Sequence, residues 1–577
     1  MMLALTLATT GLVGPVQSAP PHRAGGVTAL PATTVGPNAL ANGGFESGTA
    51  APWSVGSGWT IDGQTSHAGR FSYRRDAGAP TATTTLEVGA GTYRLSAWIK
   101  TEDLGGNVRL RLDRRPSSFQ WSTTEVERGT ADWRRYETEL VVTERATVTL
   151  RLEAEDGATG TAWFDDVKLE EVLPPPLQAF ALYPNFRGMV FDDGSSTLTF
   201  DVQVVPPGHD FSRHTVQGAL RDEETGRVVT TAAYPARAAM VAQLDARSMR
   251  LDRTYLATFT LVDDPSGTEV YATPPYRVVR APASARTAMK ASFDRENRLE
   301  VRGVPRFLLG GDDLRIARRV SSMSLDVEML DACATTADAA FARYVSARGG
   351  RTGALVVAAV APTDDLRRWR DVADLVATDT HALFGPEPAA GYDHGAVARA
   401  TARSRAAVKD ARPVIGILPF APLSSLGRPP TYAEMRAHAY MAIVEGARGL
   451  WWTTPAPGAC GDCGGETREI DELTSVIEEL TALEPVLLAD DAHGALSANS
   501  NSNIKTRVKR VNGTGFVLAY NASGSRQSTT FTWSSVPGTV RVHGEDRALV
   551  PSGRAFSDAF GPFAAHVYVV ADDTGAR

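Results

Sequence analysis

Carboxylate side chains follow several short apolar segments in the second half of the chain. Asp379 closes a segment that begins at Ala373, and His381 lies two residues further on. The other carboxylates in such positions are Asp312, Asp313, Asp364, Asp365 and Glu466. Hydrolysis of a glycosidic bond ordinarily uses two carboxyl groups about 5–9.5 Å apart. These residues, chiefly Asp379, Asp312 and Glu466, are therefore candidate catalytic groups; the other interpretation is hydrogen-bonded strand ends or solvated loops.

Tryptophan is concentrated near the start of the chain, where six of the ten tryptophans lie between positions 53 and 163. A flat ring can stack on the apolar C–H face of a sugar while neighbouring polar side chains bind its hydroxyls. Trp59, Trp121 and Trp133 stand among Gly, Ser, Gln and Arg residues, which favours positions near the surface. They are predicted either to form a sugar-binding platform or to fill a core. Trp98, inside an alternating strand pattern, is predicted to lie in the core.

Two adjacent tryptophans, Trp451 and Trp452, end another apolar segment. Successive residues of a strand point to opposite faces. One ring is therefore predicted to line a sugar pocket while the other packs beneath helices, and the sequence leaves open which is which. His381 is a further candidate for contact with a sugar.

Composition and charge exclude several classes of function. The net charge of −7 gives no global basic field for binding nucleic acid or an anionic membrane. Cys460 and Cys463 have CxxC spacing, but Cys333 is the only other cysteine, so no second pair completes a zinc site. The pair is expected to be a loop disulfide or two free thiols, with a redox or metal role as the alternative.

The first residues predict export. Residues 1–16 are apolar or small, and the Val-Gln-Ser sequence at 16–18 is a possible cleavage site before Ala19. No Lys or Arg precedes this stretch, which is atypical of such a signal. No later segment approaches the ~18 apolar residues of a membrane-spanning helix. The mature protein is expected to be soluble and secreted, with residues 1–18 as its signal peptide.

The elements that must position these residues fall into four blocks. Residues 38–172, 177–283 and 500–572 show alternating runs between turn residues, which predicts three β-sandwich domains, the second immunoglobulin-like. Residues 290–492 alternate short apolar strands with amphipathic helices, which predicts a parallel sheet in an α/β domain. Three prolines at 174–176 are expected to form a stiff linker between the first two sandwiches.

Within the α/β block, strands are predicted at 306–309, 354–360, 373–377, 413–418 and 449–452. One helix is predicted to open at Thr431, which has capping-box spacing with Glu434. Another helix is predicted from an apolar face formed by Ile470, Leu473, Ile477, Leu480 and Leu483. An eight-stranded barrel usually needs about 250 residues and this block has about 200, so an open or incomplete barrel is expected.

Two short motifs lie at the two ends of the first block. They are Asn-Gly-Gly-Phe-Glu at 42–46, with Trp53 shortly after, and Trp-Phe-Asp-Asp-Val at 163–167. Together they resemble the carbohydrate-binding modules of the CenC-like group, in which the two chain ends meet and share a structural calcium ion. The resemblance implies that Glu46 and Asp166 bind Ca²⁺, with backbone carbonyls completing an oxygen shell. The other interpretation is that both carboxylates are solvated turn residues.

Motifs in the remaining blocks occur in a defined order. Tyr-Pro-Asn-Phe-Arg-Gly at 183–188 opens the second block, and further motifs lie at 431–452 and at 544–568. As a set they resemble exported bacterial proteins in which a sandwich precedes a glycoside-hydrolase-like barrel and a terminal sandwich follows it. The resemblance implies an acid/base carboxylate after the fourth barrel strand and a nucleophile at the end of the seventh.

The chain departs from that pattern at both positions. The stretch of about 45 residues between Leu309 and Ala354 leaves no room for strands two to four, and the strand at 413–418 runs into Leu-Pro-Phe without a carboxylate. The sequence therefore favours a secreted glycan-binding protein with a structural calcium ion in its first sandwich. Its partner is expected to be a polysaccharide or other glycan, and it is expected to be weakly catalytic or non-catalytic. The alternative is an active glycoside hydrolase that uses displaced carboxylates.

Overall fold

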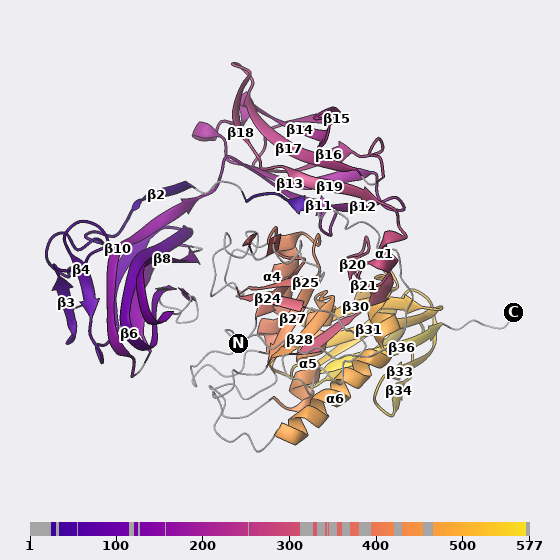
Figure 1. Ribbon diagram of the computed structural model, residues 1–577. Coiled ribbons are helices and arrows are strands. Elements are labelled where there is room, and N and C mark those ends of the chain that lie inside the picture. The colour runs from indigo at the N-terminus through magenta and orange to yellow at the C-terminus, as the bar shows by residue number, and fades with distance from the viewer. Residues whose placement is uncertain are drawn as a thin grey trace, which may run out of the picture.

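The chain folds into three all-β parts and one α/β part, which follow one another along the sequence except for β1 (Gly26–Val27), which precedes the first part and joins the second (Figure 1). The computed structural model describes residues 25–30, 34–54, 56–114, 121–124, 127–142, 144–155, 157–251, 253–311, 327–331, 341–342, 344–345, 355–360, 370–379, 394–419, 430–453 and 466–572. In this described part, no helix has the length and apolar character needed to cross a membrane.

The first part is a β-sandwich whose strands join into one nine-stranded sheet. Its strands are β2 (Thr34–Asn38), β3 (Trp59–Asp62), β4 (Ser72–Arg75), β5 (Ala82–Val88), β6 (Gly91–Arg114), β7 (Trp121–Thr123), β8 (Glu127–Val142), β9 (Ala146–Ala154) and β10 (Thr159–Leu173). The first half of β6 pairs with β10 and β8, and its second half pairs with β9. The alternating segments at 92–99 and 108–112 therefore belong to one strand, β6. Register shifts between Ile99 and Val108 and a positive φ at Asp103 allow it to bend from one layer to the other.

The second part is a sandwich of a seven-stranded and a three-stranded sheet. It consists of β1 (Gly26–Val27), β11 (Leu177–Tyr183), β12 (Met189–Phe191), β13 (Thr197–Val204), β14 (His214–Asp222), β15 (Val228–Pro235), β16 (Ala239–Asp245), β17 (Thr254–Asp263), β18 (Thr268–Ala272) and β19 (Tyr276–Ala281), with short 3-10 turns at Pro207–His209 and Phe211–Arg213.

Strand β1 comes from the chain that precedes the first sandwich. It pairs antiparallel with β19, and the backbone N–H and hydroxyl of Thr28 both donate to the carbonyl of Pro275. Two chain segments therefore connect the first two sandwiches, one before β2 and one after β10. Thr34 and Leu173 are partners in the β2–β10 ladder, so the two connections leave the first sandwich side by side (Figure 1).

The α/β part contains a parallel sheet of six described strands in the order β23-β28-β27-β26-β25-β24. Its elements are α1 (Ala285–Ala288), β20 (Ser292–Phe293), β21 (Leu299–Val301), β22 (Val304–Arg306), β23 (Leu308–Gly311), β24 (Val327–Asp331), β25 (Leu355–Val360), β26 (Leu375–Asp379), α4 (Gly395–Val408), β27 (Val414–Pro419), α5 (Tyr432–Val444), β28 (Gly449–Thr453), α6 (Glu466–Ala482) and α7 (Glu484–Leu488). The stretch between Leu309 and Ala354 was expected to leave no room for strands two to four, and β24 corrects this by placing one strand there. Among the described strands, β23 and β24 are the two edges, and the incomplete barrel stays a prediction.

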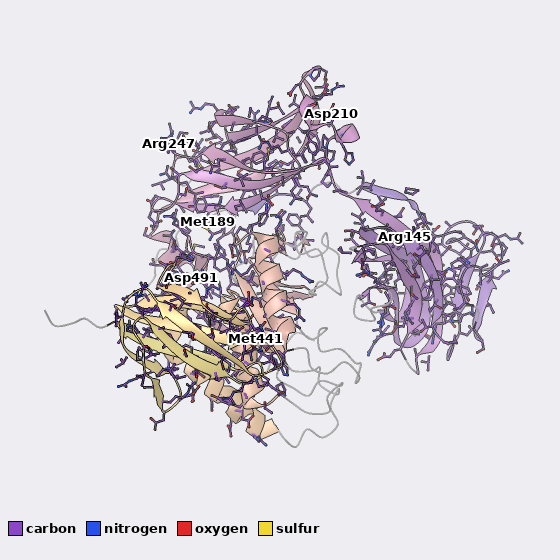
Figure 2. All side chains as sticks on the ribbon, turned by 180° about the vertical axis from the view of Figure 1, so that it is seen from behind. Arg145, Met189, Asp210, Arg247, Met441 and Asp491 are labelled. Carbon is purple, nitrogen blue, oxygen red and sulfur yellow. The ribbon has the colours of Figure 1, made fainter. Side chains whose placement is uncertain are left out.

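The helices on this sheet begin and pack as their sequences predict. Thr431 and Glu434 form the capping box at the start of α5, each side chain bonding the other residue's backbone N–H. The apolar face predicted for α6 is buried against α5 and the sheet. On its other face the sheet buries Leu355, Val357 and Ile415 in a cluster that also contains Met189 from the second sandwich, labelled in Figure 2.

The last part is a sandwich of a three-stranded and a five-stranded sheet. Its strands are β29 (Leu496–Asn499), β30 (Ile504–Val511), β31 (Thr514–Asn521), β32 (Gln527–Trp533), β33 (Pro537–Val542), β34 (Arg547–Leu549), β35 (Ala555–Phe560) and β36 (Ala565–Asp572). Leu518 and Tyr520 of β31 belong to the core cluster of α5 and α6, so this sandwich covers the helices.

The motif at 183–188 joins the second sandwich to the α/β part. Arg187 donates to both carboxylate oxygens of Asp374, just before β26, at 2.9 and 2.6 Å. The Asn185 amide donates to the carbonyl of Asp294 and the side chain of Asn297, both at 2.7 Å. The motif is thus a joint between two parts of the fold.

Candidate functional site

Aromatic rings gather on the outer face of the first half of β6. Ala97 and Ile99 are 1% and 3% exposed and belong to the core. Trp98 lies between them, so its ring points to the opposite, outer face, where it is half-buried. This corrects the placement of Trp98 in the core. The sequence already indicated this position, because Trp98 falls on the same face of the strand as the polar residues Thr92, Arg94 and Ser96.

His67 and Trp133 complete this ring cluster. The imidazole of His67 stacks on Trp98, with centroids 3.8 Å apart and planes inclined by 13°. Trp133, half-buried on β8, meets the same imidazole edge-on at 5.8 Å and 66°. Trp98, Trp133 and His67 are called the ring face below. His67 lies on the β3–β4 loop, 31 residues before Trp98. The sequence pattern could not predict this contact, because an irregular loop has no periodicity that would show where its side chains point.

Polar side chains border the ring face. Lys100 pairs with Asp132 at 2.8 Å, and Arg135, the ladder partner of Trp98, pairs with Glu137 at 2.8 Å. Both pairs lie on the two strands that carry the tryptophans. Rings with charged and hydrogen-bonding groups at their margin match the mixed surface of a sugar.

Three carboxylates hold the loop that carries His67. Asp62 accepts the N–H groups of Gln64 and Thr65, Asp165 accepts those of His67 and Ala68, and Glu46 accepts those of Arg70 and Phe71. Burial raises the pKa of Asp62, but the hydrogen bond from the Trp163 indole and the two loop N–H groups outweigh it, so the pKa is lowered overall. Burial raises the pKa of Asp165 above its usual value. The loop is therefore anchored along most of its length.

Trp59 and Trp121 do not form a platform with these rings as far as the structure describes them. Trp59 is 5% exposed and packs on Tyr73 and Phe164 at 4.6 and 5.7 Å. Its indole N–H donates to the carbonyl of Pro80 at 2.7 Å. Because a sugar needs an exposed ring face, Trp59 is a core residue and the surface position expected for it is wrong. Trp121 lies on β7, and its side chain is outside the described residues.

Glu46 and Asp166 lie at the two ends of the first sandwich, and these ends meet. Val167 N–H donates to the carbonyl of Gly43 at 2.9 Å. A Cβ on Gly44 would lie 3.7 Å from Asp166 Oδ1 and 3.8 Å from Glu46 Cγ, so both carboxyl groups flank this glycine. Both also have protein partners, since Glu46 holds the loop and Asp166 Oδ2 lies 2.8 Å from His67 Nδ1. Within the described residues no three His, Cys, Asp or Glu side chains are grouped to hold a metal, and calcium stays a prediction.

Two aspartates end strands at the carboxyl edge of the parallel sheet. Asp379 is the last residue of β26, and Asp331 is the last residue of β24, which the sequence analysis did not identify. The strands flank β25, where Asp331 pairs with Ala359. Glu466 begins α6. The side chains of these three carboxylates are outside the described residues, as are Asp312, Asp313, Asp364, Asp365, His381, Cys333, Cys460 and Cys463 altogether.

The two adjacent tryptophans of β28 face opposite sides of the sheet. Trp452 is fully buried among the side chains of α5 and α6, so it cannot stack on a sugar and is a core residue. Trp451 is half-buried and packs on the other face, close to Gly310, where a Cβ would lie 2.3 Å from its ring. Of the pair, Trp451 is the one that remains a candidate for contact with a ligand.

The chain was compared with known proteins. No protein-family model and no curated protein matches it. Among solved structures, the carbohydrate-binding module TmCBM61 in complex with β-1,4-galactotriose is 25% identical and covers 24% of this chain and 99% of its own, with a TM-score of 0.20. An Anoxybacillus α-amylase is 12% identical and covers 45% of this chain and 63% of its own, with a TM-score of 0.32. A β-glucuronidase of Parabacteroides merdae is 8% identical and covers 86% and 90%, with a TM-score of 0.28.

These similar structures are a carbohydrate-binding module and glycosidases, and the chain spans less than two thirds of the amylase. None is described as a CenC-like module, so that finer identification stays a prediction. Each TM-score is below 0.5, and the proposals below therefore rest on the residues of this chain.

Proposed function

We propose that this chain is an exported glycan-binding protein whose binding site is the ring face of the first sandwich. The observation that carries the proposal is the outward position of Trp133 and of Trp98, one face of which is covered by the His67 ring, while other aromatic rings fill the core. The apolar signal-like stretch at residues 1–18 supports export. A polysaccharide outside the cell is the partner that fits both features.

The borders of the ring face support a sugar as the ligand. Tryptophan rings take the C–H face of a pyranose, and the ion pairs of Lys100 and Arg135 offer donors and acceptors to the hydroxyls around it. The anchored β3–β4 loop keeps the rings in place before the ligand arrives, which lowers the entropy lost on binding.

The test is binding of the full chain to β-1,4-galactotriose, cellotriose, xylotriose, mannotriose and maltotriose by calorimetry. Trp98→Ala and Trp133→Ala should each weaken the tightest interaction by about 1–3 kcal/mol, the magnitude typical of aromatic contacts in recognition sites. Tyr432→Ala, which removes an exposed ring from α5, is the matched control and should leave binding unchanged. Absence of binding to all five sugars, or equal binding by all variants, would reject the ring face as a glycan site.

A second function, glycoside hydrolysis in the α/β part, is favoured by the two strand-end aspartates. Strands β24 and β26 are both neighbours of β25, and through Ala359 the register of Asp331 falls on Ala377, two residues before Asp379. About 10 Å across the sheet and about 7 Å along it place the two strand ends about 12 Å apart. That spacing is slightly wider than the range of about 5–9.5 Å in which two carboxyl groups act on one glycosidic bond. No carboxylate ends β27, however, and we propose that turnover is slow or undetectable. Rapid hydrolysis of any panel sugar that is lost in Asp331→Asn and Asp379→Asn would instead establish an enzyme.

A further inference from the structure

His67 is positioned in the ring face by contacts to its backbone, to one face of its ring and to one edge of its ring. Its backbone N–H is held by Asp165 at 2.8 Å and its ring by Trp98 at 3.8 Å. Nδ1 lies 2.8 Å from Asp166 Oδ2. The side chain is still 27% exposed, so the imidazole is positioned by the protein and open to solvent.

The contact with Asp166 determines what the other ring nitrogen can do. A carboxylate oxygen cannot donate, so Nδ1 carries the hydrogen in this bond. In the neutral imidazole, Nε2 then holds a lone pair and is an acceptor. Among the described residues none is seen to bond Nε2. The fold therefore presents one oriented acceptor at the edge of an aromatic cluster.

We propose that His67 is a specificity-determining residue of the ring face, whose Nε2 accepts a hydrogen bond from one hydroxyl of the bound sugar. This inference rests on the proposed glycan function. The His67 and Trp133 rings meet at 66° and form a corner. A sugar ring packed by its C–H face in that corner brings a hydroxyl at its rim to the imidazole edge. Sugars that lack this hydroxyl, or point it away, lose the bond and are discriminated against.

The test uses the full chain and the tightest-binding trisaccharide of the five-member panel, together with its mono-deoxy analogues. His67→Phe keeps a flat ring for Trp98 and removes both nitrogens, and it should weaken binding about three- to tenfold, the range for one hydrogen bond. One deoxy analogue should lose the same factor in the unsubstituted protein and lose nothing further in His67→Phe. The matched control is His209→Phe at an exposed turn of the second sandwich, which should bind as the unsubstituted protein does.

The outcomes separate this inference from the proposed function. If Trp98→Ala and Trp133→Ala lose binding while His67→Phe does not, or if every deoxy analogue loses equally in both proteins, the ring face stands and the role of His67 is wrong. If none of the three variants changes binding, the ring face itself is wrong. Should His67→Phe fail to fold, the Nε2 chemical shift of His67 in the unsubstituted protein decides: it moves on sugar binding if the bond forms and stays if it does not.

Discussion

His438 is an imidazole buried where α5 meets α4 and the last sandwich. It is 1% exposed, and its Nε2 lies 3.0 Å from Nδ1 of His394, whose ring packs on Phe563 at 4.8 Å. Burial is the main cause that lowers the pKa of His438 to about 3; His394 lowers it further and Glu434 raises it. The folded protein therefore holds this ring neutral.

Because of His438, the free energy of unfolding should decrease as the pH is lowered. An unfolded histidine takes up a proton near its usual pKa of about 6.5, whereas His438 in the fold does not until about pH 3. Between these values the unfolded state binds one more proton, so the free energy of unfolding falls by up to about 1.4 kcal/mol per pH unit as pH decreases. Urea unfolding at pH 7, 6, 5 and 4 should show a smaller slope in His438→Gln than in the exposed-residue control His209→Gln. Equal slopes would show that another group dominates.

Residue roles could be predicted where local chemistry sets them and not where distant contacts do. The pairing of Thr431 with Glu434 depends on four consecutive residues and is confirmed. The burial of Trp59 depends on Tyr73 and Phe164, which come from other strands, and the sequence analysis placed it wrongly. The part of His67 in the ring face likewise depends on a turn whose shape is set by three separate carboxylates.

Elements were predictable when their periodicity was long and unbroken. The five-residue apolar face of α6 is confirmed, and β13 buries alternate residues apart from Asp201, whose carboxylate is held by Arg370 and Lys409. Strand β24 has only five residues and lies in a stretch that is short for further strands, and the two halves of β6 resemble separate strands because the bend between them resembles a turn. In both cases the missing information was which other strand supplies the hydrogen-bond partners.

The proposed calcium ion between the two ends of the first sandwich can be tested by its effect on stability. If Glu46 and Asp166 share an ion between the segment before β3 and the end of the sandwich, its binding stabilises the folded state, by about 2.7 kcal/mol at a hundredfold excess over Kd. Chelation should lower the melting temperature of the full chain, and Glu46→Gln should abolish that difference. Glu155→Gln, at an exposed carboxylate of the same sandwich, should keep it. Superimposable melts with and without chelator would rule the ion out.

At the scale of the whole molecule, buried ion pairs join the second sandwich to the α/β part. Arg370 and Lys409 both donate to Asp201 of β13, at 2.9 and 2.6 Å. The side chain of Asp374 is fully buried beneath Arg187. Burial opposes the charge of Arg187, but the Asp374 carboxylate holds the pKa of the guanidinium above its usual value. The two parts are thus joined by ion pairs whose carboxylates, Asp201 and Asp374, are fully buried, while the Lys409 side chain stays partly exposed.

Removing one partner of such a pair leaves the other charge buried. Arg187→Met should lower the free energy of unfolding by about 3–5 kcal/mol, measured in urea. Arg187→Met combined with Asp374→Asn should recover part of that loss because the stranded carboxylate is gone. Arg247→Met, at the exposed rim labelled in Figure 2, breaks an ion pair in solvent and should change little. A loss no larger than that of the control would mean that the joint depends on apolar packing alone.

The paired exit of β2 and β10 from the first sandwich limits how that sandwich can turn. A single connecting segment between two domains allows either domain to rotate freely about that segment. Two strands that leave together and end on different sheets, β1 on β19 and β11 on β13, must wind around each other before the sandwich can spin. The first sandwich can therefore tilt toward or away from the remaining parts, but its rotation about the axis of the two connecting segments is restricted. If the ring face binds a long polymer chain as proposed, that chain should pass the α/β part along a restricted set of directions.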